Sequence, residues 1–260
     1  MKWSRVAAFS LLLAGTAQAG IPPKAETAYL DGRFASAANI AEADGSAEAL
    51  TFAARALIAG AIMRDGVYCE PCLTVAETIA QSAIDRDPKY AEAYVQLAIA
   101  MGFRGRFLGA MDAQSERLPE KGRQAIDKAL ELDPLSSWAK ASLGAWHLEI
   151  VHRAGPVLAE VTYGASRTEG LKAFREALAG DPGNLLLHFH FALSILALDA
   201  DEFRTEALQA LEAGYKDPRG DALTLFTRKR ADELMAVLKT GNTTEIEPLV
   251  RKFQGYPPKP

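Results

Sequence analysis

The chain has 260 residues, of which 49% are hydrophobic and 24% charged, and its formal net charge is −4 at pH 7. These fractions are typical of a globular protein with a substantial core. A mildly acidic chain has no positive field for nucleic acid, so we expect no nucleic-acid partner. The basic cluster Arg228-Lys229-Arg230 is followed by Asp232 and Glu233, which favours a solvated helix face over a binding patch.

Residues 1–19 have the pattern of a secretory signal peptide. Lys2 and Arg5 precede a short apolar run over residues 6–14, and Ala17-Gln18-Ala19 has the A-x-A pattern of a cleavage site. The run is shorter than the roughly 20 apolar residues that a spanning helix needs, which disfavours an uncleaved anchor. We therefore expect cleavage after Ala19, a periplasmic or secreted bacterial protein, and no membrane-spanning segment.

Beyond residue 25 the chain alternates apolar helical segments with Gly, Asp-Gly and Asp-Pro breaks, and we find no convincing strand pattern. Residues 106–118 and 157–164 are expected to be irregular inserts, and residues 255–260 an extended tail. The expected helices span residues 26–43 with a break at Gly32, then 47–63, 74–85, 90–103, 119–132, a segment from Ser136 or Ser137 to 152, 167–179, 185–198, 201–213, 221–239 and 244–253.

A short loop before the expected helix at 74–85 carries Cys69-Glu70-Pro71-Cys72. In an exported protein two cysteines this close favour a structural disulfide. Free thiols remain an alternative, as does a redox-active or metal-binding C-x-x-C. A thioredoxin-like βαβ context is missing, and no His follows Cys72, which excludes covalent haem attachment of the C-x-x-C-H type.

One pattern recurs along the chain: a helix, an Asp-Pro stop and another helix, with the prolines at 88, 134, 182 and 218. Small residues stand at fixed distances before these prolines, because antiparallel helices approach within about 8–10 Å only where contact residues are small. They are Ala83, Ala129, Ala177 and Ala213 five residues before, and Ala76, Gly122 and Gly170 twelve residues before. The following helices repeat Leu97-Ala98, Leu143-Gly144 and Phe191-Ala192.

This pattern resembles the tetratricopeptide repeat (TPR) over roughly residues 25–218. The first two Pro-to-Pro intervals exceed the standard unit of about 34 residues, and the extra residues fall in the two inserts. The resemblance implies an all-α, TPR-like solenoid of antiparallel helix pairs with lengthened repeats. We expect a signal peptide at 1–19, the repeat domain at 20–218, C-terminal capping helices at 219–254 and a tail at 255–260.

In TPR proteins the first helix of each pair lines a concave groove that usually binds the partner. The residues carried over to this groove are mostly apolar and lack the Lys/Asn/Arg set of chaperone-binding relatives: Val95, Ile99, Phe103, Trp138, Leu148, Leu186, Phe189, Leu193 and Leu196. Such a surface needs a cover. The inserts and C-terminal helices could fold over it, a protein partner or second copy could dock there, or an apolar small molecule could occupy it.

No residue pattern identifies a reaction. G-x-S-x-G, P-loop and H-E-x-x-H motifs are missing. His188 and His190 point to different sides of their helix, and His147 is expected to pack in the core, so we predict no metal site and no cofactor. Nothing in the spacing of Glu149 distinguishes it from a residue on a solvated helix face. We therefore expect a non-catalytic scaffold that docks a protein partner, or alternatively a carrier of an apolar small molecule or lipid associated with a transport system.

Overall fold

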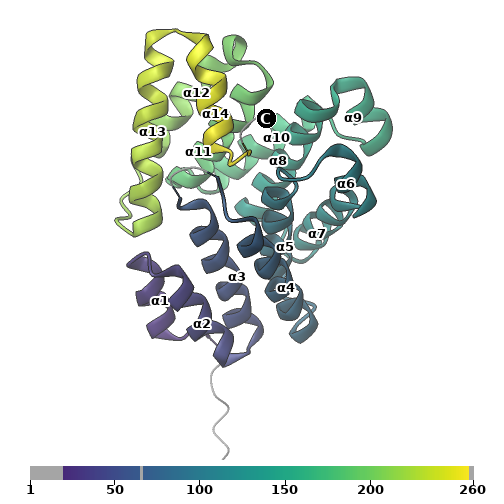
Figure 1. The fold of residues 1–260 in the computed structure, drawn as a ribbon, viewed down its shortest axis with the longest axis vertical. Helices are drawn as coiled ribbons and strands as arrows, with labels where there is room; N and C mark the ends of the chain where they lie inside the picture. The colour runs from purple at the N-terminus through teal and green to yellow at the C-terminus, as the bar shows by residue number, and fades with distance from the viewer. Residues whose placement is uncertain (1–19, 65–66, 258–260) are drawn as a thin grey trace, which may run out of the picture.

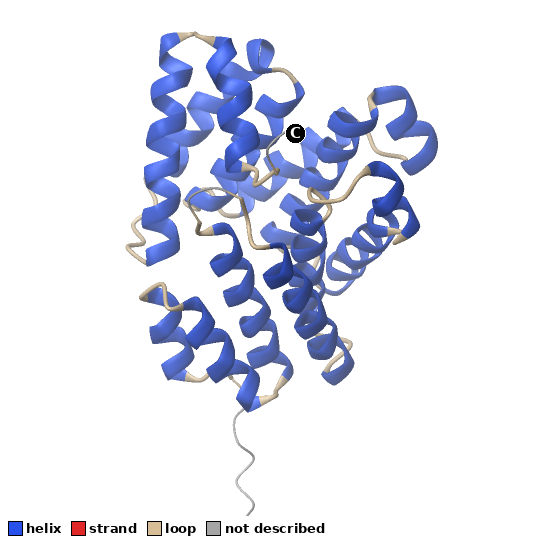
Figure 2. Cartoon of the chain, viewed as in Figure 1, coloured by secondary structure: helices blue, strands red, loops and turns tan. Residues whose placement is uncertain are grey.

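The computed structural model describes residues 20–64 and 67–257. The expected signal peptide at 1–19 lies outside the described residues. Within them the chain forms fourteen α-helices and no strand, which confirms the all-α prediction (Figure 2). No helix in the described part of the chain is long and apolar enough to cross a membrane.

Twelve of these helices form six pairs, two of which have a short helix between their members in the chain, and each pair also packs on the next (Figure 1). This arrangement confirms a solenoid of helix pairs. The pairs are α1 (Pro23–Leu30) with α2 (Phe34–Asp44), α3 (Ala47–Ile62) with α4 (Glu70–Arg86), α5 (Ala91–Arg104) with α7 (Leu118–Leu132), α8 (Ser137–Ala154) with α10 (Arg167–Gly180), α11 (Leu185–Leu198) with α12 (Ala200–Gly214), and α13 (Ala222–Thr240) with α14 (Thr243–Phe253).

The Asp-Pro stops work through the aspartate as well as the proline. Proline cannot continue the ladder of helix hydrogen bonds. The carboxylates of Asp87, Asp133 and Asp217 each accept a hydrogen bond from the backbone N–H two residues later, at 2.9, 3.0 and 3.0 Å. This Asx turn reverses the chain and delivers it to the next helix. Asp217 also accepts from the backbone N–H of Leu185 at 2.9 Å, which joins the end of one pair to its beginning.

Small residues permit the close approach of α8 and α10. A Cβ added to Gly144 would lie 2.5 Å from Cδ2 of Phe174, and one added to Gly170 would lie 2.4 Å from Cδ2 of Leu148. Ala129 and Ala177 are fully buried, as the repeat predicts. The prediction is wrong for the pair α11–α12, where Ala213 is only half-buried.

In the pair α11–α12 the close contact is made by Gly214, the next residue along the chain. A Cβ on Gly214 would lie 2.7 Å from Cβ of His188, so no larger residue fits there without a shift. The repeat register is therefore displaced by one position in the pair α11–α12, because α12 continues to Gly214 before the Asp217 turn.

We had expected the two inserts to be irregular, and this expectation is wrong. Each contains a short helix, α6 (Ala110–Ser115) and α9 (Pro156–Tyr163), and these lie on the same side of the molecule (Figure 1). Gly155 ends α8 with φ of 78°, and Pro156 stands in the first turn of α9, a position that proline favours. The Tyr163 hydroxyl donates to the Gln114 amide oxygen at 2.6 Å and ties the two inserts together.

The C-terminal pair packs on α11 and extends back to the first helix pairs. Phe253 lies with its ring centroid 5.9 Å from that of Phe189, and the start of α13 meets the α1–α2 turn, where Ala222 lies close to Gly32. Arg230 on α13 donates to the carbonyl of Arg64 at 2.8 Å. The solenoid therefore closes on itself, and its own C-terminus covers much of the inner face.

The tail is also not extended where the structure describes it. Gly255 has φ of 77°, and the N–H of Tyr256 bonds back to the carbonyl of Arg251 at 3.2 Å. A Cβ on Gly255 would overlap the ring of Tyr68, at 2.2 Å from Cδ2, so only glycine fits this close approach. The remaining residues, 258–260, lie outside the described part.

Candidate functional site

The predicted groove residues divide into two groups in the structure. Five are buried in the core, largely where α13 and α14 cover the inner face: Val95, Leu148, Leu186, Phe189 and Leu196. The other four line a cavity: Ile99, Phe103, Trp138 and Leu193. A binding role for these nine residues remains a prediction, and the cavity is the part of this set to which a ligand has access.

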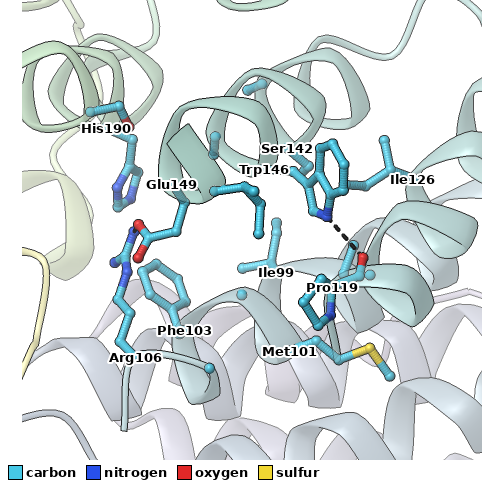
Figure 3. Close-up of a pocket in the computed structure, with 18 of the residues that line it drawn as sticks. Ile99, Met101, Phe103, Arg106, Pro119, Ile126, Ser142, Trp146, Glu149 and His190 are labelled. Carbon is cyan, nitrogen blue, oxygen red and sulfur yellow. Dashed lines mark hydrogen bonds and ion pairs between the residues drawn. The ribbon is translucent and has the colours of Figure 1, made fainter. Parts of the chain in front are cut away.

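The cavity has a volume of about 170 Å³ and is partly open to solvent. Its walls come from α5, α7, α8, α10 and α11, with the segment after α5 and Gln254 at one end. Most of the lining is apolar, including Ile99, Phe103, Ile126 and Trp146 (Figure 3). It therefore combines the first helices of three successive pairs, α5, α8 and α11, with the second helices of two, α7 and α10.

Trp146 holds α8 against the start of α7 beside the cavity. Its indole N–H donates to the carbonyl of Pro119 at 2.8 Å (Figure 3). The guanidinium of Arg123 lies 5.2 Å from the centroid of the indole ring, within the range of a cation–π contact. This wall is therefore held by a specific hydrogen bond as well as by packing.

One end of the cavity is polar, and we call Arg106, Glu149 and His190 its polar end (Figure 3). The Arg106 guanidinium donates to a carboxylate oxygen of Glu149 at 3.2 Å and to the carbonyl of Gln254 at 2.7 Å. The other Glu149 oxygen accepts from the hydroxyl of Tyr256. Burial by itself raises the pKa of Glu149, but Arg106 and Tyr256 outweigh it, so this carboxyl has a lowered pKa and stays ionised.

His190 has a different status at this end. Its ring points toward Arg106 and Glu149 (Figure 3), and no hydrogen bond joins it to another described residue. Its only resolved partners are aromatic rings, with centroid distances of 5.8 Å to Phe103 and 6.1 Å to Phe189. Burial, followed by the charges of Arg106 and Arg230, lowers the pKa of His190 to about 4, so the imidazole is neutral at pH 7.

The expectation that the basic cluster on α13 is a solvated face is wrong for Arg230, which is only 7% exposed. Its guanidinium lies 4.3 Å from the ring centroid of Phe226 and 5.3 Å from that of Phe253. It also contacts the hydroxyl of Tyr68, which in turn donates to the carbonyl of Phe253. Arg230 therefore adds a buried positive charge behind the polar end.

Sequence reasoning missed this polar end for a physical reason. Its residues belong to segments far apart in the chain, and only closure of the solenoid brings Arg106, Glu149, His190, Arg230 and Tyr256 together. One signal was available: Glu149 stands on the helix face that the repeat assigns to the interior, where an unpaired carboxylate is costly. A carboxylate at that position therefore predicts a cationic partner.

Cys69 and Cys72 are joined in a disulfide, as predicted. They do not lie in a loop before the helix, because α4 begins at Glu70, with Cys69 as its N-cap and Cys72 in its first turn. Pro71 in that first turn lets the helix start earlier than expected. The pair packs beside Tyr68 and Leu73 in the core next to Phe103. No group of three potential metal ligands converges among the residues that the structure describes.

Comparison with known proteins yields one family. A family model described as "RMD1-3: Regulator of microtubule dynamics protein 1-3" matches residues 25–239, from α1 to the last turn of α13. No curated protein matches the chain significantly.

Proposed function

We propose that this chain, which belongs to the regulator of microtubule dynamics protein 1-3 family, is a non-catalytic helical-repeat protein that binds a small apolar ligand in the cavity between α5, α7, α8 and α11. The observation that carries the proposal is the cavity itself: a half-open space with apolar walls and one polar end. Ligand sites have this composition, with few polar groups that fix orientation. The inner face elsewhere is covered by the C-terminal pair.

The size of the cavity limits what it encloses. At about 170 Å³ it is close to the engineered cavity of roughly 150 Å³ that binds benzene. Drug-sized sites are commonly about 300–1,000 Å³. The cavity therefore suits one aromatic ring or a short branched alkyl group, and a longer molecule would extend through the mouth. This favours a small ligand over an enclosed lipid.

The same proposal includes the origin and location of the protein. The helix pairs are TPR-like units lengthened by α6 and α9, and residues 1–19 form a signal peptide cleaved after Ala19. The mature protein is periplasmic or secreted, and we propose a bacterial source for it. The Cys69–Cys72 disulfide supports export, because such bonds persist in oxidising compartments.

A matched pair of variants tests the cavity. Ser142 lines it on α8, whereas Ser82 is an exposed residue of α4. Apart from Trp3, the tryptophans are Trp138 and Trp146, and both line the cavity, so tryptophan fluorescence of the protein cleaved after Ala19 reports on it directly. We expect toluene to change this fluorescence saturably in the wild type and in Ser82→Leu but not in Ser142→Leu. Equal responses in all three proteins, or no response in the wild type, would refute the proposal.

A second candidate function, a scaffold that docks a protein partner, is favoured by a separate surface. The inserts expose Met111 on α6 and Val157, Leu158 and Val161 on α9, with exposed fractions of 85%, 76%, 56% and 82%. Grouped exposed apolar side chains of this kind mark interaction sites. A partner crosslinked to the wild type should be lost from a Val157→Glu/Val161→Glu variant and retained by Ser142→Leu; retention by both variants would reject this surface.

A further inference from the structure

We propose that the ligand of the cavity is a small apolar carboxylate whose anionic group accepts a hydrogen bond from His190, in the positive field of Arg106 and Arg230. This inference rests on the proposed function, because it names the class of ligand for the same cavity. It follows from the charges around the polar end, the unused imidazole and the volume of the apolar part.

The charges at the polar end do not cancel. Arg106, Arg153 and Glu149 line the cavity, and Arg153 is exposed, so solvent screens its charge. Glu149 is fully engaged, with one oxygen bonded to Arg106 and the other to Tyr256. Arg230 adds a third positive charge from behind, through its contacts with Tyr68 and Phe253. An excess of positive charge in a poorly solvated site is compensated best by an anion that enters with the ligand.

The guanidinium of Arg153 is already fixed in place. It donates to the carbonyls of Gly105 and Leu108 at 2.7 and 2.8 Å, which secures the chain between α5 and α6. This arginine therefore supplies field rather than a free donor. Arg106 is also held, by Glu149 and the carbonyl of Gln254, although its buried Nε has no hydrogen-bond partner among the described residues. A ligand that enters the cavity can use the charge of both residues without displacing their bonds.

His190 supplies the donor. A neutral imidazole carries one N–H, and among the described residues His190 has ring contacts and nearby charges but no hydrogen-bond partner. The ring lies at the inner end of the apolar walls and points toward the charged groups (Figure 3). A carboxylate within hydrogen-bond distance of the imidazole would accept this proton donor and lie close to Arg106. The two nearby arginines would repel an ammonium group, and a neutral head would leave the positive field uncompensated.

The apolar part of the ligand is set by the walls. A cavity of about 170 Å³ accommodates one ring, so benzoate is the probe that matches both the ring and the charge. Benzylamine and benzyl alcohol keep the ring and carry a different polar group, and toluene has the ring without a polar group. Comparison of these four molecules separates the contribution of the carboxylate from that of the apolar walls.

The experiment is a titration of the protein cleaved after Ala19 with each probe at pH 7 and low salt, followed by calorimetry and tryptophan fluorescence. We expect benzoate to bind at least about tenfold more tightly than toluene or benzyl alcohol, as a charge-assisted bond implies, and benzylamine to bind most weakly. In His190→Leu, benzoate should lose most of its advantage over toluene, while toluene itself changes less than about twofold. The His190 ring protons should also titrate at higher pH with benzoate bound.

The possible outcomes distinguish this inference from the proposed function. If toluene binds in the cavity but benzoate binds no more tightly, the carboxylate assignment is wrong and the apolar site remains. If none of the four probes binds, the proposed function fails as well. If His190→Leu weakens toluene and benzoate equally, His190 only shapes the wall, and the assigned hydrogen bond is rejected.

Discussion

Replacement of Gly144 by alanine tests the close packing of α8 and α10 more directly than any other single change. The added Cβ would lie 2.5 Å from Cδ2 of Phe174 and 2.9 Å from the carbonyl oxygen of Gly170. Phe174 is 1% exposed, and the carbonyl belongs to the backbone of α10, so neither can move aside without disturbing its surroundings. The substitution therefore forces the two helices apart.

Two opposing effects set the size of the change. Alanine is favoured over glycine inside a helix by about 1 kcal/mol. Overpacking of a filled core costs about 1–3 kcal/mol, and the backbone contact places Gly144 toward the upper part of that range. We expect the free energy of unfolding to fall by about 1–2 kcal/mol in total, which corresponds to a melting temperature lower by roughly 2–8 °C for a chain of this size.

Gly102 provides the matched control, because it lies within α5 and a Cβ placed on it would meet nothing within 4 Å. Gly102→Ala should benefit from the helix preference of alanine without any overpacking, and so raise the free energy of unfolding by about 0.5–1 kcal/mol. Urea unfolding monitored by circular dichroism measures both variants, and their difference isolates the overpacking. If Gly144→Ala were as stable as Gly102→Ala, the assigned α8–α10 contact would be wrong.

Three further predictions concern the core, the polar end and the disulfide. Ala129→Leu, at a fully buried contact, should lose about 1–3 kcal/mol in the same urea assay, and an unchanged melting temperature would contradict the repeat register. Because His190 titrates near 4 in the folded protein but near 6.5 in the unfolded chain, stability should fall as pH drops from 6.5 to 4, by at most about 3 kcal/mol; a pH series should show a smaller fall in His190→Leu. A thiol assay of the unreduced protein should detect neither Cys69 nor Cys72, and two reactive thiols would remove the disulfide.

The repeated helix pairs could be predicted because their determinants are local. Asp133-Pro134 ends a helix wherever it stands, and the Asp133 carboxylate makes the turn with its own neighbours. Small residues such as Ala129 and Gly170 mark where helices meet, and both are buried as expected. The register failed at Ala213 because α12 continues to Gly214, which packs on His188 instead, and a contact between two helices is not contained in a local rule.

The cover of the inner face could not be predicted, since it depends on where the C-terminal pair docks. The sequence left three occupants open, and the structure shows that α13 and α14 cover much of this surface. The polar end has the same origin. Arg230 reads as a surface residue in a helical pattern, and it is buried in the structure. Glu149 gains the Tyr256 hydroxyl as a partner only because the tail returns to the middle of the chain.

By itself, the sequence determined an all-α chain of helix pairs, the positions of most of their ends, and the Cys69–Cys72 bond. These depend on interactions between residues close in the chain, or on a spacing that repeats. Tertiary structure alone decided that the solenoid closes, that a cavity of about 170 Å³ remains inside it, and that His190 faces Arg106 there. Those features arise from contacts between distant segments, where burial and charge depend on the whole fold.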